Sequence, residues 1–233
     1  MKNIIYIIIV VLFVLPSISN AQISEGGIPW SFHQTGLSQV PEHALPGVTK
    51  NEINHIKNKN LHTKALQFAT SFDLHLDFIN SGVWDILPNG NKIWRLAIRS
   101  ANAYSLTIIL NDFSLPSGVK LFVYNKNKSQ VSGAFTKNNN NPAEVLAISP
   151  VSGDEIIIEY NVPAFQKDYG RFIIKKVGHA FMNISHSLLK DGQFGISADC
   201  HVNINCPEGA DWQVEKNAVC RIITQGTYLC TGT

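Results

Sequence analysis

Four cysteines are the residues of this sequence best suited to chemistry, and all lie in its last part: Cys200, Cys206, Cys220 and Cys230. Cysteines in such a cluster bind zinc or form disulfides. Zinc sites usually combine two C-x-x-C pairs, or one such pair with two histidines. Here five, thirteen and nine residues separate successive cysteines, and His201 is the only histidine near them. The spacing favours disulfides, and we expect no metal and no other cofactor.

The N-terminus has the layout of a secretory signal peptide. Lys2 precedes an unbroken apolar run, Ile4–Leu15, which is shorter than the roughly 20 residues that a membrane-spanning helix needs. Small residues before Gln22 predict cleavage after Ala21. The alternative is a single N-terminal anchor. Cleavage predicts a secreted protein, extracellular or periplasmic, with no membrane contact and with cysteines in an oxidising environment.

Composition narrows the class of protein further. The net charge of +2 and the pI near 8.3 are too mild to indicate a nucleic-acid partner. Charged residues make up 15% of the chain and apolar residues 45%, a balance that is typical of a secreted β-rich protein.

The middle of the chain has the pattern of short β-strands. Apolar residues alternate with period two, and Gly, Pro and Asn clusters separate the runs. Eight or nine short strands without a convincing helix predict an all-β fold, an antiparallel β-sandwich of jelly-roll type. We expect strands at 73–79, 92–99, 103–110, 119–124, 130–135, 145–148, 155–160 and 171–177.

The aromatic residues and an asparagine run have plain structural interpretations. Trp84, Trp94 and Tyr104 are expected to fill the core between the sheets. The run Asn138–Asn141 has no interleaved carboxylates and therefore lacks the ligands of a calcium loop. We interpret it as a solvated hairpin tip.

Changes of pattern along the chain divide it into segments. Up to about residue 70 the sequence is rich in Gly and Pro, and the apolar spacing of 52–68 is poor for a helix. We expect a signal peptide at 1–21, an extended arm at 22–70, the sandwich at 71–183, a protease-accessible linker at 184–194 and a separate segment at 195–233.

The cysteine segment resembles the start of the mature domain of lysyl endopeptidases, which are trypsin-like serine endopeptidases of the chymotrypsin fold. That family has the pattern G-x-S-x-x-C-N-x-x-V-x-C-P-E-G, with His201 standing here in place of the usual Asn. Matching positions are Gly195, Ser197, Cys200, Cys206, Pro207, Glu208 and Gly209. The sequence from Ala218 to Thr233 is similar to the family's first barrel hairpin, which leads on to the T-A-x-H-C segment with the catalytic histidine.

The upstream part is similar to the β-rich propeptides of secreted Bacteroidetes proteases. Gly26–Phe32 looks like their G-G-x-P-x-S-F start. Shorter similarities are Gly82–Trp84, Ile93–Leu96, Ala103–Leu106, Gly133–Thr136 and Pro150–Asp154.

The resemblance implies a propeptide sandwich followed by the truncated start of a trypsin-like protease domain. Processing is expected between Lys190 and Gly195. The family cysteines that match Cys200, Cys206 and Cys230 pair with partners later in the protease domain, whereas Cys220 has no counterpart. In this chain alone, Cys200–Cys206 and Cys220–Cys230 are the most accessible local pairs.

Two classes of function follow from this sequence. In the first, the chain is the N-terminal portion of a secreted serine endopeptidase precursor. A serine protease needs a nucleophile, a histidine and a carboxylate. None of the eight histidines lies near a Ser or Asp in an arrangement that suggests such a triad. We therefore expect no catalytic residue and no activity in this chain. The complete parent would cleave protein or peptide substrates, and the propeptide would bind its own protease domain. In the second, the chain is a non-catalytic secreted binding or surface module.

Overall fold

The computed structural model describes residues 24–63, 65–184 and 207–232. Outside them lie the expected signal cleavage site at Ala21 and Gln22, the expected processing site at Lys190 and Gly195, and the cysteines Cys200 and Cys206.

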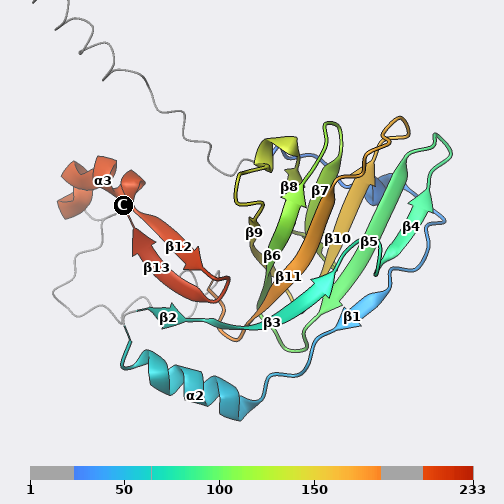
Figure 1. Cartoon of the computed structure of the whole chain (residues 1–233). Helices are drawn as coiled ribbons and strands as arrows, with labels where there is room; N and C mark the ends of the chain where they lie inside the picture. Colours follow the sequence, from blue (N-terminus) through green and yellow to red (C-terminus); the bar gives the residue numbers. More distant parts are fainter. Residues whose placement is uncertain (1–23, 64, 185–206, 233) are drawn as a thin grey trace, which may run out of the picture.

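Two β-sheets face each other and form a sandwich (Figure 1). The large sheet has the strand order β1-β5-β10-β7-β8, with β4 also paired to β5, and the small sheet has the order β3-β11-β6-β9. All pairings in these two sheets are antiparallel except that of β1 with β5. The predicted all-β, mainly antiparallel fold is therefore confirmed.

The strands of the large sheet are β1 (Glu42–Ala44), β4 (Val83–Ile86), β5 (Lys92–Arg99), β7 (Lys120–Asn125), β8 (Val131–Phe135) and β10 (Glu155–Val162). Those of the small sheet are β3 (Ala69–Leu76), β6 (Ser105–Ser114), β9 (Leu146–Ser152) and β11 (Arg171–Ala180).

Burial of apolar side chains between the two sheets holds the sandwich together. Alternate residues of each central strand point inward, and a continuous cluster of fully buried side chains results. At its aromatic centre, the ring of Phe172 makes edge-on contacts with Trp94 and Tyr160, with centroids 5.8 and 5.2 Å away. Half-buried Trp84 packs against this centre. Tyr104 does not: it is 56% exposed just before β6, so its expected place in the core is wrong.

The eight predicted strands all overlap strands of the sandwich, and β5 has the predicted bounds. The arm at 22–70 is not extended throughout, because it contains the helix α2 (Lys50–Asn60), which begins with a capping box between Thr49 and Glu52. Short helical turns are η1 (Trp30–His33) and η2 (Lys137–Asn139).

The asparagine run is not a hairpin tip, because the strands on its two sides, β8 and β9, belong to different sheets. Within the run, Asn139 is 6% exposed, and its amide oxygen accepts from Thr136 N at 2.9 Å. The Asn140 amide bonds both backbone groups of Leu115. Side-chain hydrogen bonds therefore shape the crossing from one sheet to the other.

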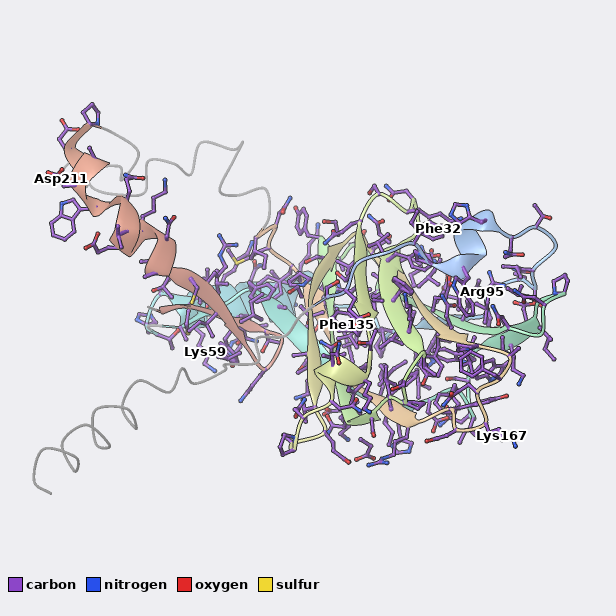
Figure 2. All side chains as sticks on the ribbon, turned by 90° about the horizontal axis from the view of Figure 1, so that it is seen from above. Phe32, Lys59, Arg95, Phe135, Lys167 and Asp211 are labelled. Atoms are coloured by element: carbon purple, nitrogen blue, oxygen red, sulfur yellow. The ribbon has the colours of Figure 1, made fainter. Side chains whose placement is uncertain are left out.

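The N-terminal segment from residue 24 to 45 runs along the large sheet and is tied to it by backbone hydrogen bonds. Glu25 N donates to Ala134 O at 3.0 Å, and Leu45 N donates to Arg99 O at 2.8 Å. Between these ends, η1 places Ser31 over the outer face of the sheet, where it contacts buried residues of β7 and β10. The side chains of Phe32 and Arg95 lie on this side of the molecule (Figure 2).

A fully buried carboxylate, Glu159, anchors this segment. Its oxygens accept hydrogen bonds from the backbone N–H and hydroxyl of Ser31 and from the Tyr124 hydroxyl, at 3.1 Å for the N–H and 3.0 Å for the Tyr124 hydroxyl. Burial raises the pKa of Tyr124, and the negative charge of Glu159 raises it further, so the phenol stays protonated as a donor. The carboxylate therefore joins three segments that are distant in sequence.

Replacing this carboxylate tests its role as an anchor. Glu159→Ala leaves the Ser31 backbone N–H buried without its acceptor and leaves the hydroxyls of Ser31 and Tyr124 with only each other as partners. We therefore expect a loss of roughly 3 kcal/mol in the free energy of unfolding, measured by urea denaturation. The control is Asp73→Ala, which removes a solvent-exposed carboxylate 3.9 Å from Lys176 and should cost less than about 1 kcal/mol. Equal losses in the two variants would contradict the anchoring role.

Candidate functional site

The C-terminal hairpin (β12, Cys220–Thr224, and β13, Tyr228–Gly232) lies beside the sandwich and is bound to it through a third sheet, the hairpin sheet, with the order β12-β13-β2 (Figure 1). The two-residue strand β2 (Leu66–Gln67) pairs antiparallel with β13, with Gln67 opposite Tyr228 and Leu66 opposite Leu229. Since β3 begins two residues after β2, the same stretch of chain takes part in both the hairpin sheet and the sandwich.

The tip of the hairpin makes the most specific contacts with the sandwich. The carbonyl oxygen of Thr227 accepts from Phe68 N at 3.0 Å and from Ala69 N at 3.3 Å. The preceding carbonyl, of Gly226, accepts from the Thr107 hydroxyl on β6 at 2.9 Å. Thr227 is only 4% exposed. Buried carbonyls need such donors, so the tip fits this position on the small sheet.

The fit depends on a residue without a side chain on β11. A Cβ atom at Gly178 would lie 2.2 Å from Thr107 Oγ1 and 2.8 Å from Gly226 O. Both distances are too short for non-bonded atoms, so any side chain at Gly178 would displace the tip or the threonine. We call the contact surface formed by Phe68, Ala69, Thr107 and Gly178 the hairpin dock.

Apolar packing extends the dock along the hairpin. Phe68, Ala69, Ala180 and Ile184 form a small buried cluster. Partly buried Ile223 and Leu229, one from each hairpin strand, pack against that cluster. The pairing with β2, the turn contacts and this cluster therefore together hold the hairpin against the sandwich.

The two cysteines of the hairpin are both free thiols, Cys220 exposed and Cys230 partly buried. The hairpin loop covers residues 225–227, so Cys220 lies opposite Gly232 and Cys230 lies opposite Ile222. Direct cross-strand pairing of Cys220 with Cys230 is therefore not found. Gln225 and Gly226, both with positive φ, begin the loop.

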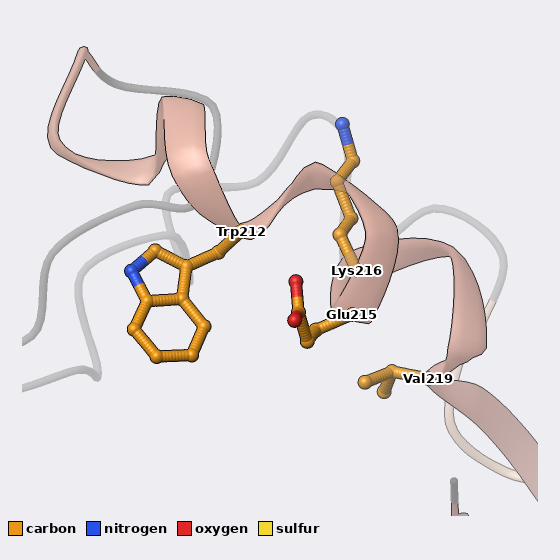
Figure 3. Close-up of a pocket in the computed structure, with 4 residues that line it drawn as sticks. All are labelled: Trp212, Glu215, Lys216 and Val219. Carbon is orange, nitrogen blue, oxygen red and sulfur yellow. The ribbon is translucent and has the colours of Figure 1, made fainter.

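An open hollow of about 400 Å³ lies along the helical part of the C-terminal segment (Figure 3). It is formed by η3 (Pro207–Trp212) and α3 (Gln213–Ala218), and its lining residues are Trp212, Glu215, Lys216 and Val219. Trp212 and Val219 are 57% and 53% exposed. Among the described residues, this lining combines two apolar side chains with the carboxylate of Glu215 and the amine of Lys216.

Sequence reasoning missed one pairing of a hydroxyl with a histidine. Ser100 Oγ and His179 Nδ1 lie 2.7 Å apart, the separation seen between a nucleophile and its base. They are 1% and 2% exposed, so a substrate has no access to them. Burial lowers the pKa of His179, which keeps the ring neutral and suited to a structural hydrogen bond.

The described residues include neither a metal-binding cluster nor a helix that could cross a membrane. Residues 24–63, 65–184 and 207–232 contain no group of three or more His, Cys, Asp or Glu side chains arranged to hold a metal ion. Within the same ranges, none of the helices is long and apolar enough to cross a membrane.

The docked hairpin and the hollow beside it fall within a recognised family segment. Residues 194–233 match the family model described as the C-terminal domain of lysyl endopeptidase. This segment is related to the lysyl endopeptidases. The resemblance carried by the cysteine motif is thus confirmed at the level of the family, and residues 194–233 are the endopeptidase-related segment. The hairpin dock is the surface on which the sandwich binds that segment.

Solved structures give only distant likenesses. An exo-β-1,3-galactanase from Phanerochaete chrysosporium, in complex with β-1,3-galactotriose, is 13% identical over 48% of this chain and 29% of that chain, with a TM-score of 0.27. The insecticidal crystal protein Cry2Aa is 12% identical over 48% of this chain and 18% of that one, with a TM-score of 0.24. The chain thus spans under a third of each of these proteins, and similarities this low carry no argument about function.

Adding one methyl group tests the hairpin dock. Gly178→Ala places a Cβ atom within 2.2 Å of Thr107 Oγ1, and we expect the Phe68 amide, which bonds Thr227 O, to exchange with deuterium at least about tenfold faster. Amides of β5 should keep their protection. The control is Gly47→Ala, because a Cβ atom there meets nothing within 4 Å. Unchanged exchange at Phe68 would show that the close fit does not hold the hairpin.

The buried histidine predicts a pH dependence of stability. Because burial lowers the pKa of His179 below its ordinary value of 6.5, the unfolded state takes up a proton first, and the free energy of unfolding falls as pH falls through 6.5. We expect His179→Gln to reduce this fall between pH 7.5 and about 5.5, measured by urea denaturation. The exposed His75 supplies the control, since His75→Gln should leave the pH profile unchanged.

Proposed function

We propose that this chain is the N-terminal portion of a secreted, trypsin-like serine endopeptidase precursor of the lysyl endopeptidase type. In this proposal a signal peptide at 1–21 directs export, the arm and sandwich at 22–183 form the propeptide, and residues 195–233 begin the catalytic domain. The complete parent hydrolyses peptide bonds of protein substrates. The portion in this chain carries no catalytic residue and is inactive alone.

The observation that carries the proposal is the position of the endopeptidase-related segment. The family match at 194–233 contains the hairpin whose tip contacts Phe68, Ala69 and Thr107 of the sandwich. A propeptide that binds its own protease domain needs a surface of this kind, with donors set for buried carbonyls of the partner.

The proposal also accounts for the exposed apolar side chains of the C-terminal segment. Trp212, Val214, Val219 and Ile222 are 42% to 79% exposed. Apolar surface of this extent beside polar residues is typical of an interface. In the proposed precursor, the remainder of the catalytic domain covers these side chains, including the hollow beside Trp212.

The coding sequence after the codon for Thr233 tests the proposal. We expect the reading frame to continue into a Thr-Ala-x-His-Cys segment, which supplies the catalytic histidine, and later into a serine nucleophile. N-terminal sequencing of the mature enzyme should then find a start between Lys190 and Gly195. A stop codon directly after Thr233 would overturn the proposal in favour of a non-catalytic secreted binding module.

A further inference from the structure

The short strand β2 is held along both of its edges. On one edge it pairs with β13 of the hairpin. On the other, the amide side chain of Asn60 bonds both backbone groups of Gln67: Asn60 Nδ2 donates to Gln67 O at 2.8 Å, and Gln67 N donates to Asn60 Oδ1 at 3.0 Å. Asn60 thus takes the place of a neighbouring strand and holds β2 against the hairpin.

The helix that carries this clamp is only weakly stabilised. Asn60 is the last residue of α2, which has 11 residues, none of them buried. Its N-terminal capping box between Thr49 and Glu52 is a local interaction. Since isolated helices shorter than about 12–15 residues are marginal in water, α2 opens locally far more easily than the sandwich strands do.

Two exposed lysines lie in the last turn of this helix. Lys57 and Lys59 precede Asn60 by three residues and one residue, and both are exposed. Lys59 lies toward the hairpin end of the molecule, away from Arg95 and Phe32 (Figure 2). Local opening of α2 therefore presents lysyl peptide bonds directly beside the clamp.

We infer that α2 is a second processing site, where hydrolysis of the peptide bond after Lys57 or Lys59 frees β2 and loosens the C-terminal hairpin from the sandwich. The inference rests on the proposed function, because an endopeptidase specific for lysine supplies the cut. Water adds to the lysyl carbonyl carbon and the C–N bond breaks, which leaves a lysine carboxylate and a new amino group on Asn58 or Asn60.

The cut loosens the hairpin by removing the contact of Asn60 with β2, while the chain of the hairpin itself stays intact. After cleavage at Lys59, Asn60 becomes a chain end without a helix to position its amide. The strand β2 has only two residues, Leu66 and Gln67, and a strand so short needs both of its edges held. A cut in the linker at 184–194 leaves this pairing intact, so the two sites have different effects.

The experiment treats the secreted chain briefly, under native conditions, with an added lysine-specific endopeptidase. Peptide mapping should find new chain ends at Lys57 or Lys59, and deuterium exchange of the Phe68 amide in the nicked protein should be at least about tenfold faster than in the intact chain. The uncut variant Asn60→Ala should show the same acceleration, because it removes the clamp without a cut.

Matched variants separate the site from general digestion. Lys57→Arg combined with Lys59→Arg keeps both charges and the helix propensity but removes the two lysyl bonds beside the clamp, and should keep the slow exchange at Phe68. Lys126→Arg combined with Lys175→Arg, at exposed positions outside α2, should be nicked at α2 like the original chain. Digestion that spares α2 while cutting other lysines, or a nick without faster exchange, would overturn the inference. Because the protease is added, this result is independent of the coding sequence that tests the proposed function.

Discussion

The position of the C-terminal hairpin depends on one steric constraint, the lack of a side chain at Gly178. Only a bare backbone at this point of β11 lets Gly226 O come within 2.9 Å of the Thr107 hydroxyl. Once the tip is seated there, Thr227 O meets the two N–H groups of Phe68 and Ala69. The pairing of β13 with β2 and the packing of Ile223 and Leu229 then follow from where the tip lies.

The buried carboxylate of Glu159 holds a distant segment in place on the opposite side of the sandwich, as the hairpin dock does for the hairpin. Glu159 gives the N-terminal segment a fixed attachment through Ser31, as the dock gives the hairpin one. In both places a polar group that would be costly to bury alone is paired with donors or acceptors from a distant segment. The two ends of the described chain are thus attached to opposite outer faces of one sandwich.

Local patterns were sufficient to predict eight of the ten sandwich strands, because burial on a pleated sheet imposes a period of two that is visible in β5 and its neighbours. The other two, β1 and β4, have three and four residues and are too short to show a clear period. The helix α2 was underestimated because its apolar face is weak, although Thr49 and Glu52 already have the spacing of a capping box. The dock had no such local signal. A two-residue strand at Leu66–Gln67 has no periodicity, and its partner lies more than 150 residues away. The hairpin register depends on loop position, which alternation alone leaves open.

The strand order β12-β13-β2 gives the hairpin sheet two unlike edges. At the β2 edge, the backbone groups of Gln67 are already occupied by Asn60. At the β12 edge, no strand among the described residues pairs with the outward-facing backbone of Cys220 to Thr224. An unpaired strand edge is a template for pairing with another strand, so β12 is the edge of this sheet that offers its backbone groups to a further strand.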